Sequence, residues 1–293
     1  MNIKFTKMHG LGNDFVVIDN RETNLKRLPA LSRKLCDRRF GIGADQLLLL
    51  EHTLTADFKM RIFNADGSEV EMCGNGIRCL GKYIWDNVLG SMQDSFSRRY
   101  QSSINRIAIE TLAGIIYIQK SGSQFKVDMG EPVLDPSAIP VKTSLVKKQL
   151  KNNILQSYPV KIRDKTFKIT CVSMGNPHAV IVVKNVTIAP VESYGPLIEK
   201  HNLFPNRTNV EFIQIVDRNN IKMRVWERGA GETMACGTGA SASAVAAILL
   251  GHTDRKVNVH LPGGKLTINW SAKDNHVYMT GNAVTVFKGT VEI

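Results

Sequence analysis

Two versions of one short stretch decide the fold: EMCGNG at residues 71–76 and MACGTG at residues 234–239. Their cysteines, Cys73 and Cys236, are 163 residues apart, because 236 − 73 = 163. The same gap-free spacing relates four further pairs, namely Asn13 and Asn176, Gln46 and Asn209, Asn64 and Glu227, and Glu69 and Glu232. A register shared by sites so far apart predicts two homologous halves, each presenting one thiol from the same loop.

Both halves also show the same order of expected elements. Apolar runs predict buried strands, and the residues after each Cys-Gly-x-Gly predict a helix. The paired strands are expected at 15–18 and 179–183, 46–50 and 209–215, and 59–63 and 222–226; the paired helices at 77–88 and 240–250; the closing strands at 107–111, 115–119 and 125–128, and at 256–260, 265–270 and 277–280; a further helix at 28–39. This order predicts an α+β fold of two pseudo-symmetric homologous domains, each a mixed or antiparallel sheet wrapped around a central helix.

The repeat sets the expected domain boundaries. We expect an N-terminal half at residues 1–133 and a C-terminal half at residues 134–281. Two polar segments, 91–105 and 141–156, break the symmetry between the halves. Segments of this composition concentrate on mobile surfaces, so we expect both to be mobile and of little catalytic weight.

Composition argues against several classes of protein. The net charge is +12, but the basic residues are scattered and form no long tract, so we expect a solvated basic surface and no nucleic-acid partner. No apolar run approaches the roughly 18 residues of a membrane span, and we expect neither a signal peptide nor a membrane partner. Five cysteines without CxxC or zinc-type spacing predict free thiols, no metal and a reducing cytoplasmic location.

The two cysteine loops have the makings of a catalytic site. A cysteine at a helix start lies beside unpaired backbone N–H groups and the positive end of the helix dipole, which predicts a lowered thiol pKa. The same N–H groups suit a substrate carboxylate and the negative charge that develops when an α-proton is removed. Cys73 and Cys236 are therefore candidates for 1,1-proton transfer at an amino-acid α-carbon, whereas Cys36, Cys79 and Cys171 are expected to be buried and inert.

Other polar residues near these loops are candidates for the same site. His178 is placed to line it, although a single histidine is more often structural. The Glu227-Arg228 pair is either a ligand group or a surface ion pair of small energetic weight. Side-chain amides grip ammonium and carboxylate groups without acting as acids or bases, although each is also a common turn or cap residue. The candidates are Asn13, Gln46, Asn64, Asn75, Asn176 and Asn209.

Four longer motifs resemble the diaminopimelate epimerase family. They are FTKMHGLGNDF at 5–15, NADGSE at 64–69 leading to MCGNGIRC at 72–79, MGNPH at 174–178, and WERGAGET at 226–233 leading to ACGTG at 235–239. The match runs nearly end to end. The resemblance implies an epimerase without a cofactor that interconverts LL- and meso-2,6-diaminopimelate in lysine and peptidoglycan precursor biosynthesis. One cysteine would act as thiolate base and the other as thiol acid, with the roles reversed in the opposite direction.

The resemblance also implies roles for matching residues. The substrate would be held by Asn13, Gln46, Asn64, Gly74, Asn75, Asn176, Asn209, Glu227, Arg228, Gly237 and Thr238. His178 and Glu227 would tune the two thiols. A homodimer is implied, with an aromatic residue near the C-terminus; here that position is Phe287, where tyrosine is familiar. The family pattern places residues 282–293 in a strand that returns to the first domain.

Three alternatives stay open at the level of the sequence. A proline racemase or hydroxyproline epimerase would use the same two thiols on a cyclic substrate. A non-catalytic ligand-binding protein, or an isomerase of the phenazine-pathway type, would share the fold without the cysteine pair. A nucleic-acid-binding module rests on the net charge alone.

Overall fold

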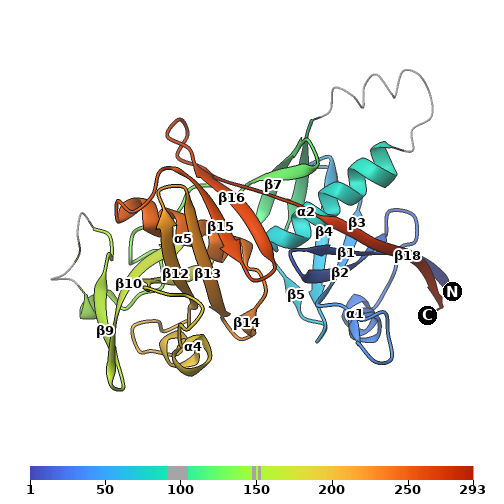
Figure 1. Ribbon diagram of the computed structural model, residues 1–293. Coiled ribbons are helices and arrows are strands. Elements are labelled where there is room, and N and C mark those ends of the chain that lie inside the picture. Colours follow the sequence, from blue (N-terminus) through green and yellow to red (C-terminus); the bar gives the residue numbers. More distant parts are fainter. Residues whose placement is uncertain (91–104, 147–149, 151–152, 293) are drawn as a thin grey trace. The chain divides into compact units, whose positions relative to one another are not determined.

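The chain folds into two compact units in a computed structural model that describes residues 1–90, 105–146, 150 and 153–292 (Figure 1). One unit is Met1–Asp128 with Thr280–Ile293, and the other is Met129–Met279. The boundaries expected from the repeat, after residues 133 and 281, lie five and two residues further along, because 133 − 128 = 5 and 281 − 279 = 2.

The first unit is a mixed sheet around one helix. Its elements are β1 (Asn2–Gly10), β2 (Asn13–Asp19), α1 (Leu28–Cys36), β3 (Gln46–Glu51), β4 (Phe58–Asn64), β5 (Glu69–Val70), α2 (Gly74–Tyr83), η1 (Ile84–Leu89), β6 (Arg106–Thr111), β7 (Gly114–Ser121), β8 (Gln124–Asp128) and β18 (Val284–Glu292). The pairs β2–β3 and β4–β6 are parallel, and β18–β1, β1–β2, β3–β4, β4–β5, β6–β7 and β7–β8 are antiparallel. Helix α2 packs against β1–β4, β7, β8 and β18.

The second unit repeats this plan. Its elements are η2 (Thr143–Leu145), β9 (Tyr158–Ile162), β10 (Lys165–Ser173), β11 (Pro177–Val182), α4 (Val191–Glu199), β12 (Asn209–Asp217), β13 (Asn220–Glu227), β14 (Gly231–Thr233), α5 (Gly237–Leu249), β15 (Lys256–Leu261), β16 (Gly264–Trp270) and β17 (Val277–Gly281). The pairs β11–β12 and β13–β15 are parallel, and β9–β10, β10–β11, β12–β13, β13–β14 and β15–β16 are antiparallel.

The spacing of 163 residues extends from the motifs to the elements that carry them. It relates the first residues of β1 and β10 (165 − 2), α1 and α4 (191 − 28), β3 and β12 (209 − 46), and α2 and α5 (237 − 74). Each parallel pair in one unit has its parallel counterpart in the other. The α+β class and the pseudo-symmetric halves predicted from the sequence are therefore confirmed.

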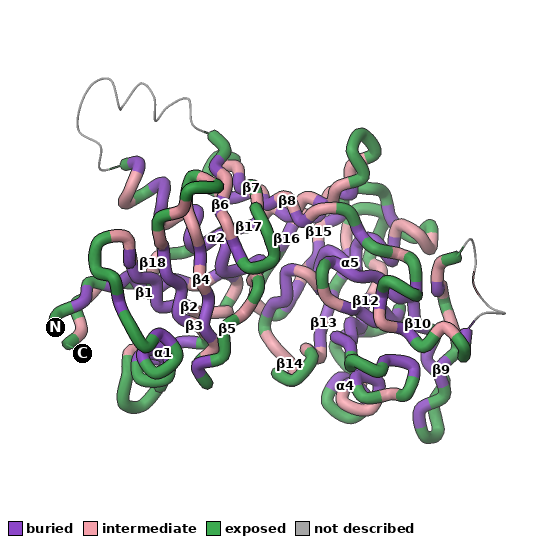
Figure 2. Tube along the Cα trace, turned by 180° about the vertical axis from the view of Figure 1, so that it is seen from behind, coloured by how far each residue is buried: buried purple, intermediate pink, exposed green. Residues whose placement is uncertain are grey.

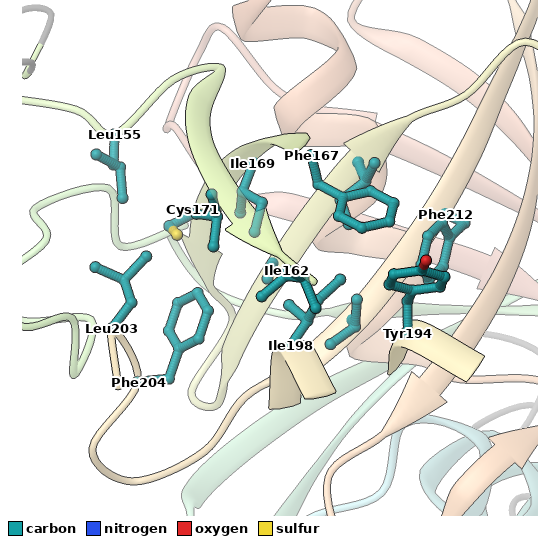
Figure 3. Packing of buried hydrophobic residues seen from close by; sticks show 14 of the residues in the cluster. Leu155, Ile162, Phe167, Ile169, Cys171, Tyr194, Ile198, Leu203, Phe204 and Phe212 are labelled. Carbon is teal, nitrogen blue, oxygen red and sulfur yellow. The ribbon is translucent and has the colours of Figure 1, made fainter. Parts of the chain in front are cut away.

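Each unit has its own apolar core (Figure 2). In the first, α1 buries Leu28, Leu31 and Leu35 with the buried side of β2 and β3. In the second, the Phe167 ring meets Tyr194 at 5.2 Å and Phe212 at 6.2 Å between ring centroids (Figure 3). Helix α5 is buried over Ala240–Ala247, as its run of small residues predicts, and Gly251 follows it with a φ of +75°.

Several details differ from the sequence-based expectations. The helix from Leu28 ends at Cys36 rather than near residue 39, and the helix after Cys73 continues from Ile84 in wider π-helical turns. Most of the 91–105 segment lies outside the described residues. The 141–156 segment is not simply a polar surface stretch, because Val141, Val146 and Leu155 are buried in the core of the second unit. Within the ranges that the structure describes, no helix combines the length and the apolar character needed to cross a membrane.

Candidate active site

Cys73 and Cys236 occupy the same position at two helix starts. Each has an extended backbone and is the N-cap of its helix, α2 or α5. The Gly76 N–H donates to Cys73 Sγ at 3.4 Å, and the Gly239 N–H donates to Cys236 Sγ at 3.4 Å. The glycines give the sulfurs the backbone donors that the sequence predicted.

The prediction of a lowered pKa is wrong for Cys236. Burial raises the pKa of this thiol well above its usual range, and the nearby carboxyl groups of Glu227 and Glu211 raise it further. Hydrogen bonds from Thr238 and Gly239 lower the pKa by less than burial raises it. The motif predicts the backbone N–H donors at the helix start, but it does not predict how deeply the sulfur is buried. Cys236 is therefore a thiol at neutral pH in this structure.

All five cysteines are free thiols. Cys36, Cys79 and Cys171 are buried, as expected from their surroundings in the sequence. Burial raises the pKa of each of these three thiols, and that of Cys79 reaches about 12. They are therefore protonated and unreactive at physiological pH.

The first unit brings Asn13 and Asn75 to Cys73. The Cys73 thiol donates to Asn13 Oδ1 at 3.6 Å, and Asn75 Nδ2 donates to the same oxygen at 3.3 Å. Asn13 Nδ2 donates to Asp45 Oδ2 at 2.8 Å, so the carbonyl side of this amide faces the sulfur. Gly74 and Asn75 are the first two residues of α2.

Gln46 and Asn64 form a second amide pair in the same unit. They lie opposite each other in the β3–β4 ladder, and Gln46 Nε2 donates to Asn64 Oδ1 at 2.8 Å. Among the described residues, Gln46 Oε1 is buried without a hydrogen-bond partner. Such an acceptor is costly to leave unpaired and suits an ammonium group of a ligand.

A charged network, which sequence reasoning missed, fixes the loop that carries Asn13 and Asp45. Lys7 Nζ donates to Asp14 Oδ2 at 2.7 Å, and Arg38 bonds to Asp14 Oδ1 at 2.8 Å and to Asp45 Oδ1 at 2.7 Å. Burial disfavours the Asp14 carboxylate, but hydrogen bonds from Arg38 and Lys7 outweigh it and hold the pKa of Asp14 below its usual range. The four charged residues of this network are far apart in the sequence, so no local sequence pattern predicts that they interact.

Removing the Asp14 charge is expected to weaken the first unit in a pH-dependent way. Asp14→Asn leaves Lys7 nearly buried without its carboxylate, at a cost of about 2 kcal/mol in the free energy of unfolding at pH 7. Because the folded-state pKa is lowered, this contribution is fully present above the unfolded pKa of about 4 and is lost progressively as the pH falls from there through the folded-state pKa, so it is reduced but not abolished at pH 3. Urea unfolding at pH 7 and pH 3 measures both values, and a difference between variant and wild type that does not shrink at pH 3 would contradict the assignment.

The second unit connects Cys236 to Thr238, Asn176 and His178. Thr238 Oγ1 lies 3.5 Å from Cys236 Sγ and accepts from Asn176 Nδ2 at 3.3 Å. His178 Nε2 lies 2.9 Å from Asn176 Oδ1. The side chain of His178, which the sequence makes a candidate for this site, is fully buried. It bears on Cys236 through these hydrogen-bonded neighbours.

Glu211 is the second residue that sequence reasoning missed. Its carboxyl Oε1 lies 2.7 Å from His178 Nδ1, and both side chains have no solvent exposure. Burial raises the pKa of Glu211, and the interaction with His178 offsets only part of this effect. The sequence does hold a signal, since Glu211 is a lone carboxyl group within the apolar run at 210–213 of β12.

The remaining predicted residues lie around the end of β13. Asn209 is nearly buried, and its amide bonds to the Pro177 carbonyl at 2.9 Å and to the Arg228 N–H at 2.9 Å. Thr233 donates a short hydrogen bond to Glu227 Oε1. The Arg228 guanidinium is exposed, and Gly237 is the first residue of α5. Asn209 is thus a candidate ligand group that also holds the backbone of Arg228 in place.

Sequence comparison places the chain among known proteins. The profile of the family described as Diaminopimelate epimerase matches residues 5–134 and 170–286. The diaminopimelate epimerase of Acetivibrio thermocellus is 51% identical, with 99% of each chain covered. That of Moorella thermoacetica is 50% identical, with 97% of this chain and 98% of the relative covered.

Structural comparison shows a fold shared beyond close relatives. A phenazine biosynthesis protein of the PhzF family from Bacillus anthracis aligns with a TM-score of 0.69 at 18% identity, with both chains fully covered. A hydroxyproline epimerase from Agrobacterium vitis aligns with a TM-score of 0.67 at 14% identity, covering 99% of this chain and 91% of that one. These similarities show the fold alone. The profile match and the relatives at about half identity carry more: the chain belongs to the diaminopimelate epimerase family.

Proposed function

We propose that this protein interconverts LL- and meso-2,6-diaminopimelate by proton transfer at the α-carbon, with Cys73 and Cys236 as the two catalytic acid–base groups. The observation that carries the proposal is that both thiols are N-caps of equivalent helices and accept an N–H from the third helical residue. Thiolate and thiol exchange roles when the reaction reverses, so one enzyme serves both directions. No cofactor is needed for this mechanism.

The polar groups around each thiol are proposed to hold the substrate. Backbone N–H groups at the starts of α2 and α5, including those of Gly74, Asn75, Gly237 and Thr238, suit the carboxylate whose α-carbon reacts. Asn13, Gln46, Asn64, Asn176, Asn209, Glu227 and Arg228 are proposed to bind the remaining ammonium and carboxylate groups. The buried, unpaired Gln46 Oε1 supports this assignment within the described part of the chain. Glu227 and His178 are proposed to tune the thiols.

The structural neighbours suggest two other chemistries, and both fit less well. The fold is similar to that of a phenazine biosynthesis protein, which suggests an isomerase of the phenazine type. That function leaves the two cysteines in matched helix-cap positions unexplained. A proline racemase or hydroxyproline epimerase would use both thiols, but that likeness is at 14% identity and shows the fold alone. The family match favours diaminopimelate, which has a second polar head group.

NMR of LL-diaminopimelate with the reduced protein in D₂O tests the proposal. Growth of the meso isomer with deuterium at the inverted α-carbon would support both the reaction and the substrate. Exchange with proline or hydroxyproline, and none with diaminopimelate, would replace the substrate while keeping the two-thiol mechanism. A folded, reduced sample that exchanges none of the three would overturn the proposed function.

We also propose a cytoplasmic homodimer. Five free thiols fit a reducing compartment. Strand β18 leaves apolar side chains on the surface of the single chain, with Val286 55% exposed and Phe287 47% exposed. The Phe287 ring packs edge-on against Phe5 at 5.9 Å between centroids, which fixes its orientation. An ordered, exposed aromatic residue is typical of an interface.

Phe287→Asp is expected to convert the dimer to a monomer, because it places a charge in an apolar contact where an unpaired charge costs several kcal/mol, roughly a 10²- to 10³-fold loss of association. Sedimentation velocity across a range of protein concentrations measures the change. Phe287→Tyr is the matched control and should remain dimeric. A wild-type protein that sediments as a monomer at every concentration would contradict the dimer.

A further inference from the structure

The two halves differ at one buried corner beneath the catalytic helices. The repeat equates His178 with Phe15, because 178 − 163 = 15, and Glu211 with Leu48, because 211 − 163 = 48. A Cβ placed on Gly76 would lie 3.3 Å from Leu48 Cδ2 and 3.4 Å from Phe15 Cε1. A Cβ placed on the equivalent Gly239 would lie 2.8 Å from Glu211 Oε1. The first unit therefore builds this corner from two apolar side chains and the second from a histidine and a carboxyl group.

Stability does not explain the polar version of the corner. Both side chains of the His178–Glu211 pair have no solvent exposure, and Glu211 Oε2 has no hydrogen-bond partner in the described part of the chain. Removing two polar groups from water in this way is costly, and apolar pairs of similar volume are often as stable or more so. Phe15 and Leu48 show that the same backbone accepts an apolar pair. The pair therefore calls for a chemical role.

A continuous chain of hydrogen bonds leads from this pair to the reactive sulfur. It runs from Glu211 to His178 Nδ1 at 2.7 Å, from His178 Nε2 to Asn176 Oδ1 at 2.9 Å, from Asn176 Nδ2 to Thr238 Oγ1 at 3.3 Å, and from Thr238 Oγ1 to Cys236 Sγ at 3.5 Å. Every member belongs to the second unit. The pair can thus act on Cys236 without touching a substrate.

The direction of each hydrogen bond follows from the chemistry of the groups. Asn176 Oδ1 only accepts, so His178 Nε2 must carry a proton and donate it. One proton is then shared between His178 Nδ1 and Glu211, so the pair has no net charge. Whenever Glu211 is ionised, the protonated His178 opposes the effect by which its carboxylate alone raises the pKa of Cys236. Asn176 Nδ2 donates to Thr238 Oγ1, which leaves the Thr238 hydroxyl proton available to donate to Cys236 Sγ once the sulfur is ionised. A donor at the sulfur favours the thiolate.

Both sulfurs accept a backbone N–H, but the first unit directs a side-chain group of the opposite polarity toward its sulfur. Asp45 accepts from Asn13 Nδ2 and turns the Asn13 carbonyl oxygen toward Cys73, whose thiol donates to it. An acceptor at the sulfur favours the protonated thiol. The equivalent amides, Asn13 and Asn176, therefore face opposite ways because one is held by an acceptor and the other by a donor. The two thiols are not chemically equivalent in this protein.

We propose that Glu211 is a positioning residue that, through His178, fixes the Asn176 amide and directs the Thr238 hydroxyl to Cys236, so that this cysteine forms its thiolate more readily. The inference rests on the proposed two-thiol function for its catalytic consequence, but not for its effect on the thiol. The ionisable groups around Cys236 are Glu227 on β13, Glu211 on β12 and His178 on β11. Glu211 itself is surrounded by His178, Glu227 and the buried thiol of Cys171.

The test transplants the first unit's corner into the second. His178→Phe/Glu211→Leu replaces the polar pair with the residues that the repeat already uses, which protects the fold. Titration of [3-¹³C]cysteine-labelled protein by NMR follows Cys236, with Cys73 in the same molecule as the internal control. In the variant, the Cys236 midpoint should rise by about one pH unit, the equivalent of a tenfold change in the ionisation equilibrium, while Cys73 stays in place. This measurement needs no substrate, so its result can be interpreted even if the proposed function is wrong.

Three further measurements sharpen the outcome. Thr238→Val removes the last donor and should produce a similar Cys236 shift, and combining it with the double substitution should add little, because all three act through one chain. The double variant should lose about tenfold in kcat with an unchanged KM, as a tenfold loss of thiolate requires. Glu211→Gln preserves the shape and should fall between. The proposal would be overturned if the Cys236 midpoint of the folded double variant were unchanged or lower than that of the wild type. It would also be overturned if Cys236 did not titrate in either protein, or if both cysteines shifted equally.

Discussion

Cys73→Ala and Cys236→Ala are each expected to lower kcat for epimerisation by roughly 10³- to 10⁴-fold, because each removes one of the two groups that exchange a proton with the α-carbon. The double variant should be scarcely worse than either single variant, since groups that act as a unit are not additive. The interconversion of LL- and meso-diaminopimelate by each variant, followed with circular dichroism, gives these rates.

Single-face exchange provides the sharper control for this prediction. A variant with one cysteine can still remove a proton from one face of the α-carbon and return a deuteron from D₂O to that face. Each variant should therefore wash the α-proton out of one epimer without inverting it, and the two variants should choose opposite epimers. Full turnover by either variant would end the two-thiol mechanism. Cys79→Ala is the matched control and should retain wild-type rates, because this buried thiol does not ionise at neutral pH.

Arg78→Met is expected to have the largest effect on stability. Arg78 is among the largest fully buried side chains of the protein. It donates to the Gly74 carbonyl at 3.0 Å, to Asn75 Oδ1 at 2.8 Å and to the Asn282 carbonyl at 3.4 Å. Methionine leaves these acceptors without this donor, so the first unit should lose about 3–5 kcal/mol of unfolding free energy. Activity should fall too, because Asn75 is released beside Cys73.

Tryptophan fluorescence isolates this effect in the first unit. Trp85 lies in the first unit, and Trp226 and Trp270 lie in the second. In a Trp226→Phe/Trp270→Phe background, urea unfolding monitored through Trp85 therefore reports the unit that contains Arg78. Arg78→Lys keeps a cation but not the planar set of donors, and should be intermediate. A midpoint for Arg78→Met equal to that of its background would show that the buried guanidinium is not what holds the Cys73 loop to the C-terminal segment.

The repeat made most of the fold readable from the sequence. Strands β2, β3 and β4 and their counterparts β11, β12 and β13 appear as apolar runs at one spacing, and the glycines after Cys73 and Cys236 mark the helix starts. Strand β10 and helix α4 were not predicted, although the spacing of 163 residues maps β1 and α1 onto them. A sequence repeat shows itself first where chemistry restricts the residues, and much less where any apolar side chain will serve.

The sequence predicts which residues surround the two cysteines, but it does not predict the electrostatics of the site. The donors at Cys236 follow from local geometry, whereas the raised pKa of Cys236 depends on burial by residues far away in the chain. Glu211 is hard to recognise in the sequence as part of the site, because its neighbours Val210 and Phe212 indicate an ordinary core strand. The charged group of Lys7, Asp14, Arg38 and Asp45 joins residues that no local pattern associates. Each of these features arises from tertiary contacts rather than from spacing along the chain.

The pairing of β18 with β1 has a consequence for synthesis on the ribosome. β1 is translated before the whole second unit, yet one of its two neighbouring strands spans Val284–Glu292 and is translated after that unit. The second unit is continuous in sequence and can fold as soon as it emerges, whereas the first must wait with an open strand edge. The nascent chain therefore completes its units in the reverse of their order in the gene, and the Cys73 loop, tied through Arg78 to Asn282, is among the last parts to be secured.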